Sequence, residues 1–375
     1  MTANSTNLAA SGADLTPIEE SRSAALEPSG SVHPRTPRDR FLQAAAGQPL
    51  AYPPVWLMRQ AGRALPEYRE LKTRYSFVQM VQTPELSAEV TLQPIRRFDF
   101  DAAVHFSDIL VVSEALGQSY RFKEGGGVAM DFEVRNRQDV ERLEPGAIRE
   151  RLAYVADALR LLRAELGSRT ALLGFAGSPW TLANFMMQGG SAADFTRAKL
   201  LYHTDRGLFR QLMARLTAAV AEHLRLQIEA GADAVQIFDS LAGLLAATDY
   251  EAASADWIRA IIEALPREIP VIVYARGFHG PWEPLIRSGA RILSVDWRVP
   301  LPWVRDRLPS GVGVQGNLDP FLMTTDPGVV ARETRQLLES MRGRTGHIFN
   351  LGHGLPPTAR LENIEALVQT VRTFP

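Results

Sequence analysis

Short apolar runs alternate with longer amphipathic segments along most of the chain, from about residue 53 onward. This alternation is typical of βα units, in which parallel strands are covered by helices. Eight apolar runs stand out, at residues 54–58, 101–106, 170–175, 233–238, 270–275, 291–295, 312–315 and 346–351. Eight such units predict the α/β fold class and a single (β/α)₈ TIM barrel over residues 37–375.

The segments between the apolar runs carry helix start signals. In the segment 83–98, Thr83 is expected to cap the helix, Pro84 takes the first helical position and Glu85 complements the helix dipole. The other predicted helices cover residues 147–166, 204–230, 249–265, 327–342 and 360–374. The stretch 117–135 contains three consecutive glycines and instead predicts a β-hairpin inserted after the second strand.

Residues 1–36 are rich in Ala, Ser, Thr, Pro and Gly and lack a sustained apolar period, so we predict a disordered N-terminal tail. Acidic residues precede or surround its first arginine, Arg22, and it has no apolar core. A secretory signal needs a basic start and an apolar core, and a transit peptide avoids acidic residues. The sequence therefore predicts an untargeted, cytoplasmic protein.

Composition excludes several classes of protein. Without cysteine the chain has no disulfide, thiolate nucleophile, iron–sulfur cluster or Cys-ligated zinc, and its seven histidines lack the spacing of metal ligands. The formal net charge of -1 provides no overall basic field for nucleic acid or an anionic membrane. The longest apolar stretches are far shorter than the roughly 18 to 20 residues of a membrane span. We expect no metal, nucleic-acid or membrane partner.

Polar residues concentrate directly after the predicted strands, which is where such a barrel has its active site. The segments concerned are residues 59–63, 107–108, 177–181, 239–240, 276–277, 296–297, 316–319 and 352–354. Arg59 and Arg63 flank a small-residue pair, so two guanidinium groups can converge on carboxylates. The pair favours an anionic substrate, although paired arginines also serve as salt-bridge partners.

Two further strand-end residues are candidates for substrate contact. Asp108 is expected to point into the cavity as a hydrogen-bond acceptor, its alternative role being that of a turn residue. His353 lies between glycines and could reach a ligand as a donor or acid, or serve as a structural histidine. A carboxylate-based hydrolase is an alternative because acids also follow other strands, although the arginine pair argues against a neutral sugar. The strand-end acids are Asp108, Asp239, Asp296 and Asp319.

The segment 53-PPVWLMRQAGRALPEYRE-70 closely resembles the signature of the uroporphyrinogen decarboxylase family. Further family blocks match in order at residues 84–110, 174–190, 294–299, 315–320 and 350–354, so the resemblance spans about residues 38–374. It implies a single barrel domain, a homodimer with facing clefts and a carboxy-lyase without a cofactor. The implied reaction removes carbon dioxide from the four acetate side chains of uroporphyrinogen III, giving coproporphyrinogen III in haem synthesis.

The resemblance also implies roles for individual residues. Asp108 would accept hydrogen bonds from the central pyrrole N–H groups and stabilise the charge that appears on the pyrrole. Arg59 has been cast as the general acid, although a guanidinium pKa above about 12 makes it a reluctant donor. With these two as catalytic residues, the implied substrate contacts are Arg59, Gln60, Ala61, Gly62, Arg63, Lys72, Asp108, Phe185, Ser240 and His353.

Three positions depart from the family pattern. Ala64 and Phe185 stand where the family has tyrosines, and residues 125–128 read GGGV where GKGP is common. Phe185 lacks a hydroxyl that would hydrogen-bond a substrate carboxylate. A tetrapyrrole-binding protein without turnover is therefore the alternative to a decarboxylase.

Overall fold

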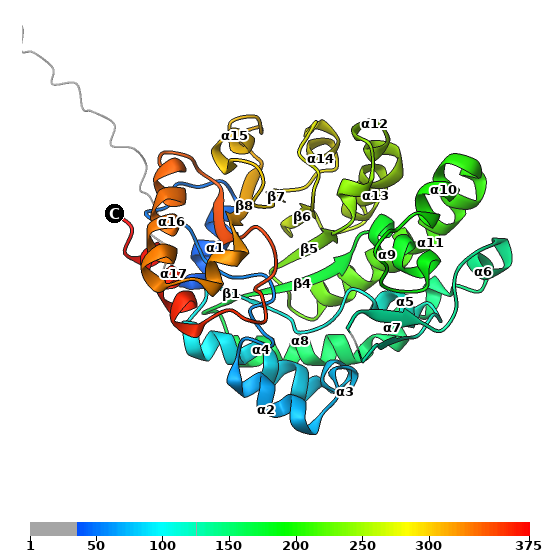
Figure 1. Ribbon diagram of the computed structural model, residues 1–375, viewed down its shortest axis with the longest axis horizontal. Coiled ribbons are helices and arrows are strands. Elements are labelled where there is room, and N and C mark those ends of the chain that lie inside the picture. The colour runs from blue at the N-terminus through cyan, green and yellow to red at the C-terminus, as the bar shows by residue number, and fades with distance from the viewer. Residues whose placement is uncertain (1–35, 125) are drawn as a thin grey trace, which may run out of the picture. The chain divides into compact units, whose positions relative to one another are not determined.

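Seven parallel strands form the centre of the protein, in a computed structural model that describes residues 36–124 and 126–375. The predicted tail lies outside the described residues, except for Thr36, whose side chain caps the first helix by accepting a hydrogen bond from Asp39 N. Each strand pairs in parallel with the next one in the chain, and helices surround the sheet (Figure 1). In order, the strands are β1 (Ala102–Val104), β4 (Ala171–Gly177), β5 (Ala234–Asp239), β6 (Val271–Ala275), β7 (Ile292–Ser294), β8 (Gly313–Leu318) and β9 (His347–Leu351).

The eighth position is filled by a segment that is too short to be a strand. Residues 54–58 were predicted as a strand but form a single parallel bridge, between Val55 and Phe349 of β9. Pro54 and the proline before it lack N–H groups, so they cannot donate to a ladder. Phe349 N donates to Pro54 O at 2.8 Å, and Asp101 N donates to Val55 O at 2.9 Å on the other side. The segment thus joins β9 to β1, and the predicted (β/α)₈ barrel is confirmed with one strand reduced to a bridge.

The predicted helical segments are helical, with breaks that the sequence pattern did not show. The segment 204–230 divides at Asp205, whose carboxylate accepts a hydrogen bond from Leu208 N at 2.9 Å and so caps a new helix. Thr83 occupies the predicted N-cap position, but its side chain makes no capping bond. The main helices are α1 (Pro37–Ala45), α2 (Pro66–Arg74), α3 (Phe77–Gln82), α4 (Pro84–Phe98), α8 (Ala153–Leu166), α9 (Pro179–Gln188), α10 (Arg197–Thr204), α11 (Arg206–Glu229), α13 (Asp256–Glu263), α16 (Pro327–Ser340) and α17 (Leu361–Arg372).

Shorter helices occupy the connections, and the predicted hairpin is present. Strands β2 (Tyr120–Phe122) and β3 (Val128–Met130) pair antiparallel after β1, as expected from the glycine-rich turn between them. The short helices are α5 (Val111–Ala115), α6 (Arg137–Glu141), α7 (Ile148–Arg151), α12 (Ala247–Tyr250), α14 (Glu283–Arg287) and α15 (Leu301–Arg305). A π-helical turn at Glu251–Ala255 joins α12 to α13 within the predicted helix 249–265.

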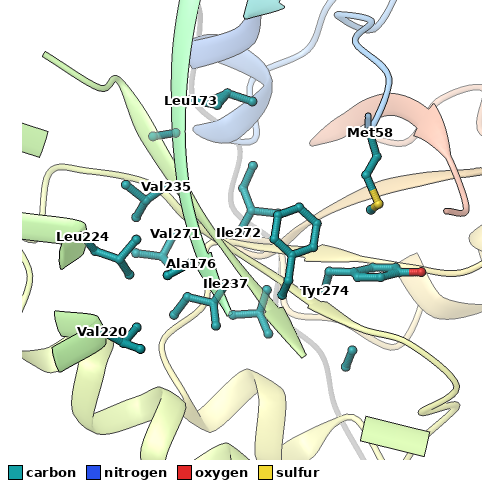
Figure 2. Packing of buried hydrophobic residues seen from close by; sticks show 14 of the residues in the cluster. Met58, Leu173, Ala176, Val220, Leu224, Val235, Ile237, Val271, Ile272 and Tyr274 are labelled. Atoms are coloured by element: carbon teal, nitrogen blue, oxygen red, sulfur yellow. The ribbon is translucent and has the colours of Figure 1, made fainter. Parts of the chain in front are cut away.

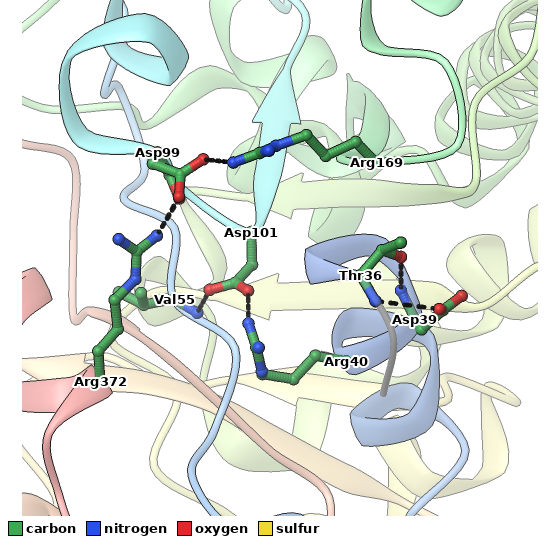
Figure 3. A network of polar contacts seen from close by, with 8 residues as sticks. All are labelled: Thr36, Asp39, Arg40, Val55, Asp99, Asp101, Arg169 and Arg372. Atoms are coloured by element: carbon green, nitrogen blue, oxygen red, sulfur yellow. Dashed lines mark hydrogen bonds and ion pairs between the residues drawn. The ribbon is translucent and has the colours of Figure 1, made fainter. Parts of the chain in front are cut away.

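Apolar side chains from the strands pack between the sheet and the helices. Figure 2 shows Val235 and Ile237 of β5 near Val220 and Leu224, which come from α11. At the N-terminal end of β1, ion pairs connect the first and last helices to the residues just before this strand (Figure 3). The Asp101 carboxylate binds Arg40 of α1, and Asp99 binds Arg372 of α17. The polar network therefore holds the first and last helices against the same edge of the barrel.

Buried histidines make stability depend on pH. Burial lowers the pKa of His105 and His347 to about 4 and that of His223 to about 3, whereas an unfolded histidine titrates near 6.5. Below pH 6.5 these histidines therefore bind protons in the unfolded chain but stay neutral in the folded chain. The free energy of unfolding then falls with decreasing pH. Each such histidine contributes a slope of about 1.4 kcal/mol per pH unit.

We predict that His223→Gln reduces this slope between pH 6 and pH 5 by about one histidine's contribution, because glutamine does not titrate. Urea unfolding of both proteins at pH 7, 6 and 5 measures the slope. Replacement of the exposed His203 in the same way is the control and should leave the slope unchanged. An equal slope in the His223→Gln protein would contradict the prediction.

Candidate active site

Arg59 lies in a tight turn that directly follows the ring-closing segment. Its φ of 62° is in the left-handed region, which is uncommon for a residue other than glycine. Gln60 holds this turn: its Oε1 accepts from Leu57 N at 3.0 Å and its Nε2 donates to Ala102 O at 3.0 Å. The backbone N–H of Gln60 also donates, to Leu57 O at 2.9 Å. Gln60 was predicted to contact substrate, but its polar groups are used inside the protein, where they position Arg59.

The loop after β9 packs against the Arg59 side chain. A Cβ at Gly354 would lie 2.4 Å from Arg59 Cδ, and a Cβ at Gly352 would lie 2.3 Å from Trp297 N. Real Cβ atoms do not approach other atoms this closely. Gly352 therefore needs to be glycine because its neighbour is backbone, and a side chain at Gly354 would displace the side chain of Arg59. The residues after the first and last strand positions thus meet at one place, as the strand-end rule predicted.

Asp108 faces Arg59 across this mouth. The carboxylate accepts a hydrogen bond from Leu110 N at 2.8 Å. Burial raises the pKa of Asp108 by more than that hydrogen bond and the charge of Arg59 lower it. Burial also lowers the pKa of Arg59, with the charges of Arg63 and Arg276 acting in the same direction. Arg59 nevertheless remains exposed to solvent and Asp108 is half-buried. A ligand that supplies complementary charges would stabilise the charged forms of both groups.

The hydrogen bonds of His353 fix which of its nitrogens carries the proton. Tyr274 has one hydroxyl proton and donates it to Gly352 O at 3.0 Å. The 3.2 Å contact between Tyr274 Oη and His353 Nδ1 must then have Nδ1–H as the donor. Burial, reinforced by Arg59 and Arg276, lowers the pKa of His353 to about 4. Near neutral pH the ring therefore offers a ligand an acceptor at Nε2, in place of the donor or acid expected from the sequence.

The other predicted site residues lie on several different elements. Gly62 and Arg63 belong to the Arg59 turn, and Ser240 directly follows β5 at the mouth. Phe185 of α9 packs edge-on against Phe195, with ring centroids 5.1 Å apart, so its ring has an apolar partner where a tyrosine hydroxyl would need a polar one. Lys72 is exposed in the last turn of α2, and no interaction among the described residues connects it to Asp108.

Three of the four strand-end acids are used within the protein. Asp239 accepts four hydroxyl hydrogen bonds, from Ser178, Thr181, Tyr250 and Ser254. Asp296 accepts from the backbone N–H of Gly277 at 2.7 Å and contacts His279, and Asp319 caps a turn through Phe321 N. Asp108 is left without a partner carboxylate of the kind that glycosidases use. The site geometry thus argues against the carboxylate-based hydrolase.

Within residues 36–124 and 126–375, no group of three or more acidic or histidine side chains is placed to hold a metal ion. No helix in this part of the chain is long and apolar enough to cross a membrane.

Known proteins resemble this chain in sequence over nearly its whole described length. The sequence model of the family described as uroporphyrinogen decarboxylase (URO-D) matches residues 36–374. The chain belongs to the uroporphyrinogen decarboxylase family. It is 44% identical over 337 residues to the uroporphyrinogen decarboxylase of Rhodospirillum rubrum, covering 88% of this chain and 96% of that protein. It is 42% identical over 340 residues to the same enzyme of Alkalilimnicola ehrlichii, covering 89% and 93%.

One solved structure with low sequence identity shares the fold of this chain. A methyltransferase from Methanosarcina mazei superposes with a TM-score of 0.71 over 90% of this chain and 98% of that one, at 18% sequence identity. This likeness concerns the barrel alone. The sequence matches, in contrast, cover every strand-end segment, including the turn of Arg59 and the loop of His353. Family membership thus rests on sequence similarity over nearly the whole described chain.

Sequence reasoning did not single out Tyr274, Arg276 or Arg298. Tyr274 is fully buried in β6 and sets the His353 tautomer, and the two arginines follow β6 and β7. The strand-end rule did mark segment 276–277, and Arg298 lies one residue beyond segment 296–297. Only the structure shows that both arginines lie within electrostatic reach of His353.

We predict that His353 is neutral and protonated on Nδ1 at pH 6, because its pKa lies near 4 and Tyr274 accepts the Nδ1 proton. Long-range ¹H–¹⁵N correlation spectra of the histidine ring nitrogens distinguish the two tautomers. Tyr274→Phe removes the acceptor and should mix the tautomers, whereas Tyr52→Phe, away from the ring, should not. An imidazolium signal at pH 6 would contradict the assignment.

Proposed function

We propose that the protein is a uroporphyrinogen decarboxylase, a carboxy-lyase that converts the four acetate side chains of uroporphyrinogen III to methyl groups. The observation that carries this proposal is a single carboxylate, Asp108, within electrostatic reach of Arg59 at a mouth rich in arginine. Family membership over residues 36–374 supports it. Loss of carbon dioxide leaves an electron pair that needs a sink, and a pyrrole protonated on a ring carbon provides one without a cofactor.

The proposed reaction proceeds through a protonated pyrrole ring. A proton adds to a pyrrole ring carbon beside the acetate, which makes the ring cationic. The bond from the acetate methylene to its carboxylate then breaks, carbon dioxide leaves, and the electron pair neutralises the ring as an exocyclic methylene. That methylene takes up a proton to become a methyl group, and the ring carbon returns its proton. The net change consumes one proton and one carboxylate for each carbon dioxide.

Asp108 is assigned the stabilisation of the cationic ring. A carboxylate accepts hydrogen bonds only, which suits the pyrrole N–H groups. Burial raises the pKa of Asp108, whose side chain is half-buried. A cation that develops beside it during the reaction is then stabilised more strongly than it would be in water. This role exists in the transition state and is weak in the ground state.

The arginines are assigned to the carboxylates. Arg59 and Arg63 bind the acetate that reacts, with the Ala61 N–H and Gly62 in the same turn lining its approach. Burial lowers the pKa of Arg59, but a bound carboxylate acts in the opposite direction. We therefore assign Arg59 a catalytic role through its charge. His353, Ser240 and Phe185 line the remaining mouth, and Lys72 is retained on the resemblance alone.

The family resemblance extends the proposal to the cellular form of the protein. We infer a homodimer with facing clefts, located in the cytoplasm, that needs neither metal nor organic cofactor. Sedimentation of the purified protein tests the dimer. Dialysis against a chelator should leave turnover intact.

The deciding experiment supplies anaerobic uroporphyrinogen III to purified, chelator-treated protein and separates the oxidised porphyrins by chromatography. Products with seven, six, five and four carboxyl groups are expected. An unchanged eight-carboxyl peak with tight binding would instead identify the binding protein without turnover. Absence of both binding and products would reject a tetrapyrrole substrate.

We predict that Asp108→Asn lowers kcat by about 10² to 10³ with a smaller change in KM, because the amide keeps the size and one acceptor but loses the charge. Asp319→Asn is the matched control, since Asp319 caps a turn after β8, and its kcat should stay within about twofold. Steady-state kinetics with circular dichroism measure both. A normal kcat in Asp108→Asn would make Asp108 a turn residue.

Arg63→Ala should show the opposite pattern. Its carboxylate contact exists before the reaction as well as during it, so we expect a raised KM and a kcat that suffers less. Arg63 is exposed and forms no ion pair with the described residues, so its removal should not affect folding. A fall in kcat as large as that of Asp108→Asn would contradict the separation of roles.

A further inference from the structure

A second group of arginines lies at the mouth, on the loops after β6 and β7. Arg276 directly follows the last residue of β6, and Arg298 lies in the loop after β7. Neither forms an ion pair with any of the described residues, unlike most arginines of this chain. Arg276 is half-buried and Arg298 is exposed. An anion bound at these two loops would interact favourably with both guanidinium groups.

The nearest acid does not neutralise either side chain. Asp296 lies between the two loops, but its carboxylate accepts from Gly277 N at 2.7 Å and from Arg298 N at 3.0 Å, and it contacts His279 Nε2 at 3.1 Å. These bonds fix the backbones of both loops. The guanidinium groups are left to interact with something else.

Ring contacts place Arg298 beside the known part of the mouth. Its guanidinium carbon lies 5.1 Å from the centroid of the Trp297 ring, and that ring stacks with His353 at 6.3 Å. Arg298 Nη1 also lies 3.8 Å from the position that a Cβ on Gly277 would take, next to Arg276. The absence of a side chain at Gly277 leaves room between the two arginines.

Electrostatics link the pair to the same cavity. Both arginines act on the pKa of His353, and Arg276 also acts on that of Arg59. Of the arginines, only Arg59 is among the groups that set the pKa of Asp108. Arg276 and Arg298 therefore lie at the same mouth as His353 and Arg59.

We propose that Arg276 and Arg298 form a second carboxylate site, which binds a side chain that the reaction leaves intact. This inference rests on the proposed function and names the part of the substrate that these residues recognise. A carboxylate between two guanidinium groups forms charge-assisted hydrogen bonds to both. The site would hold the far side of the tetrapyrrole while an acetate reacts at Asp108.

The succession of substrates decides which carboxylates the pair binds. The substrate begins with eight carboxylates and ends with four, so the last turnover starts from a molecule with five. Its one remaining reactive carboxylate must lie by Arg59 and Asp108. A second site that serves all four turnovers must therefore bind a carboxylate that is retained.

The experiment measures binding of two oxidised porphyrins by fluorescence quenching, one with eight carboxyl groups and one with only the four that are retained. We expect Arg276→Gln and Arg298→Gln each to weaken binding of both porphyrins about tenfold, as for loss of one charge-assisted hydrogen bond. Arg298→Lys keeps the cation and should recover part of the loss. Equal melting temperatures confirm that the variants fold.

Arg291→Gln is the matched control. Arg291 is exposed at the other end of the same strand, β7, and it forms no ion pair with the described residues. Its removal changes the net charge equally, but binding should stay within about twofold. Weakening equal to that of Arg298→Gln would show a general charge effect and overturn the proposal.

Two further outcomes would also contradict the proposed second carboxylate site. Unchanged affinities in both mouth variants would reject the site, and a loss confined to the eight-carboxyl porphyrin would assign the pair to reacting carboxylates. Because binding is measured without turnover, these results are independent of whether the wild-type protein decarboxylates its substrate. In an active enzyme, the same variants should raise KM about tenfold for the five-carboxyl substrate and leave kcat within about twofold.

Discussion

The closure of the barrel at Val55 is the contact on which the active site depends. Asp101 uses its backbone N–H to bind Val55 O and its carboxylate to bind Val55 N, at 2.9 and 2.8 Å. The Asp101 carboxylate thus takes the place of the backbone carbonyl that a neighbouring strand would offer to Val55 N. Burial raises the pKa of Asp101, and the ion pair with Arg40 opposes that cost. Four residues after Val55 the chain reaches Arg59, so an error in this closure would displace the arginine turn.

The mouth itself carries more positive than negative charge. Arg59, Arg63, Arg276 and Arg298 have no acidic partner at ion-pair distance among the described residues, while Asp239 and Asp296 are occupied by hydrogen bonds. Most of the other described arginines pair with acids. Such an uncompensated group lowers the stability of the empty protein and raises affinity for a polyanion. A substrate with eight carboxylates matches this distribution better than a substrate with one or two.

Sequence reasoning reached the fold because the fold follows local rules. Apolar runs marked the strands, and residues after them marked the site. It failed at residues 54–58, where the apolar run predicts a strand but the missing proline N–H groups leave a bridge. It did not show the internal hydrogen bonds of Gln60 or the position of the His353 proton, because the partners Ala102, Leu57 and Tyr274 are set by tertiary contacts. Spacing along a chain does not reveal such partners.

The charges of the mouth also constrain the chemistry. Four guanidinium groups near a pyrrole would disfavour its protonation, since the ring becomes cationic. Bound carboxylates remove this obstacle, because each one neutralises an arginine before the ring takes up its proton. The remaining uncompensated charge is then the carboxylate of Asp108, which attracts the cation. Substrate binding thus converts a site that repels a cation into one that stabilises it. On this view the retained carboxylates serve the reaction as well as recognition, because a substrate without them would leave the arginines charged beside the reacting ring.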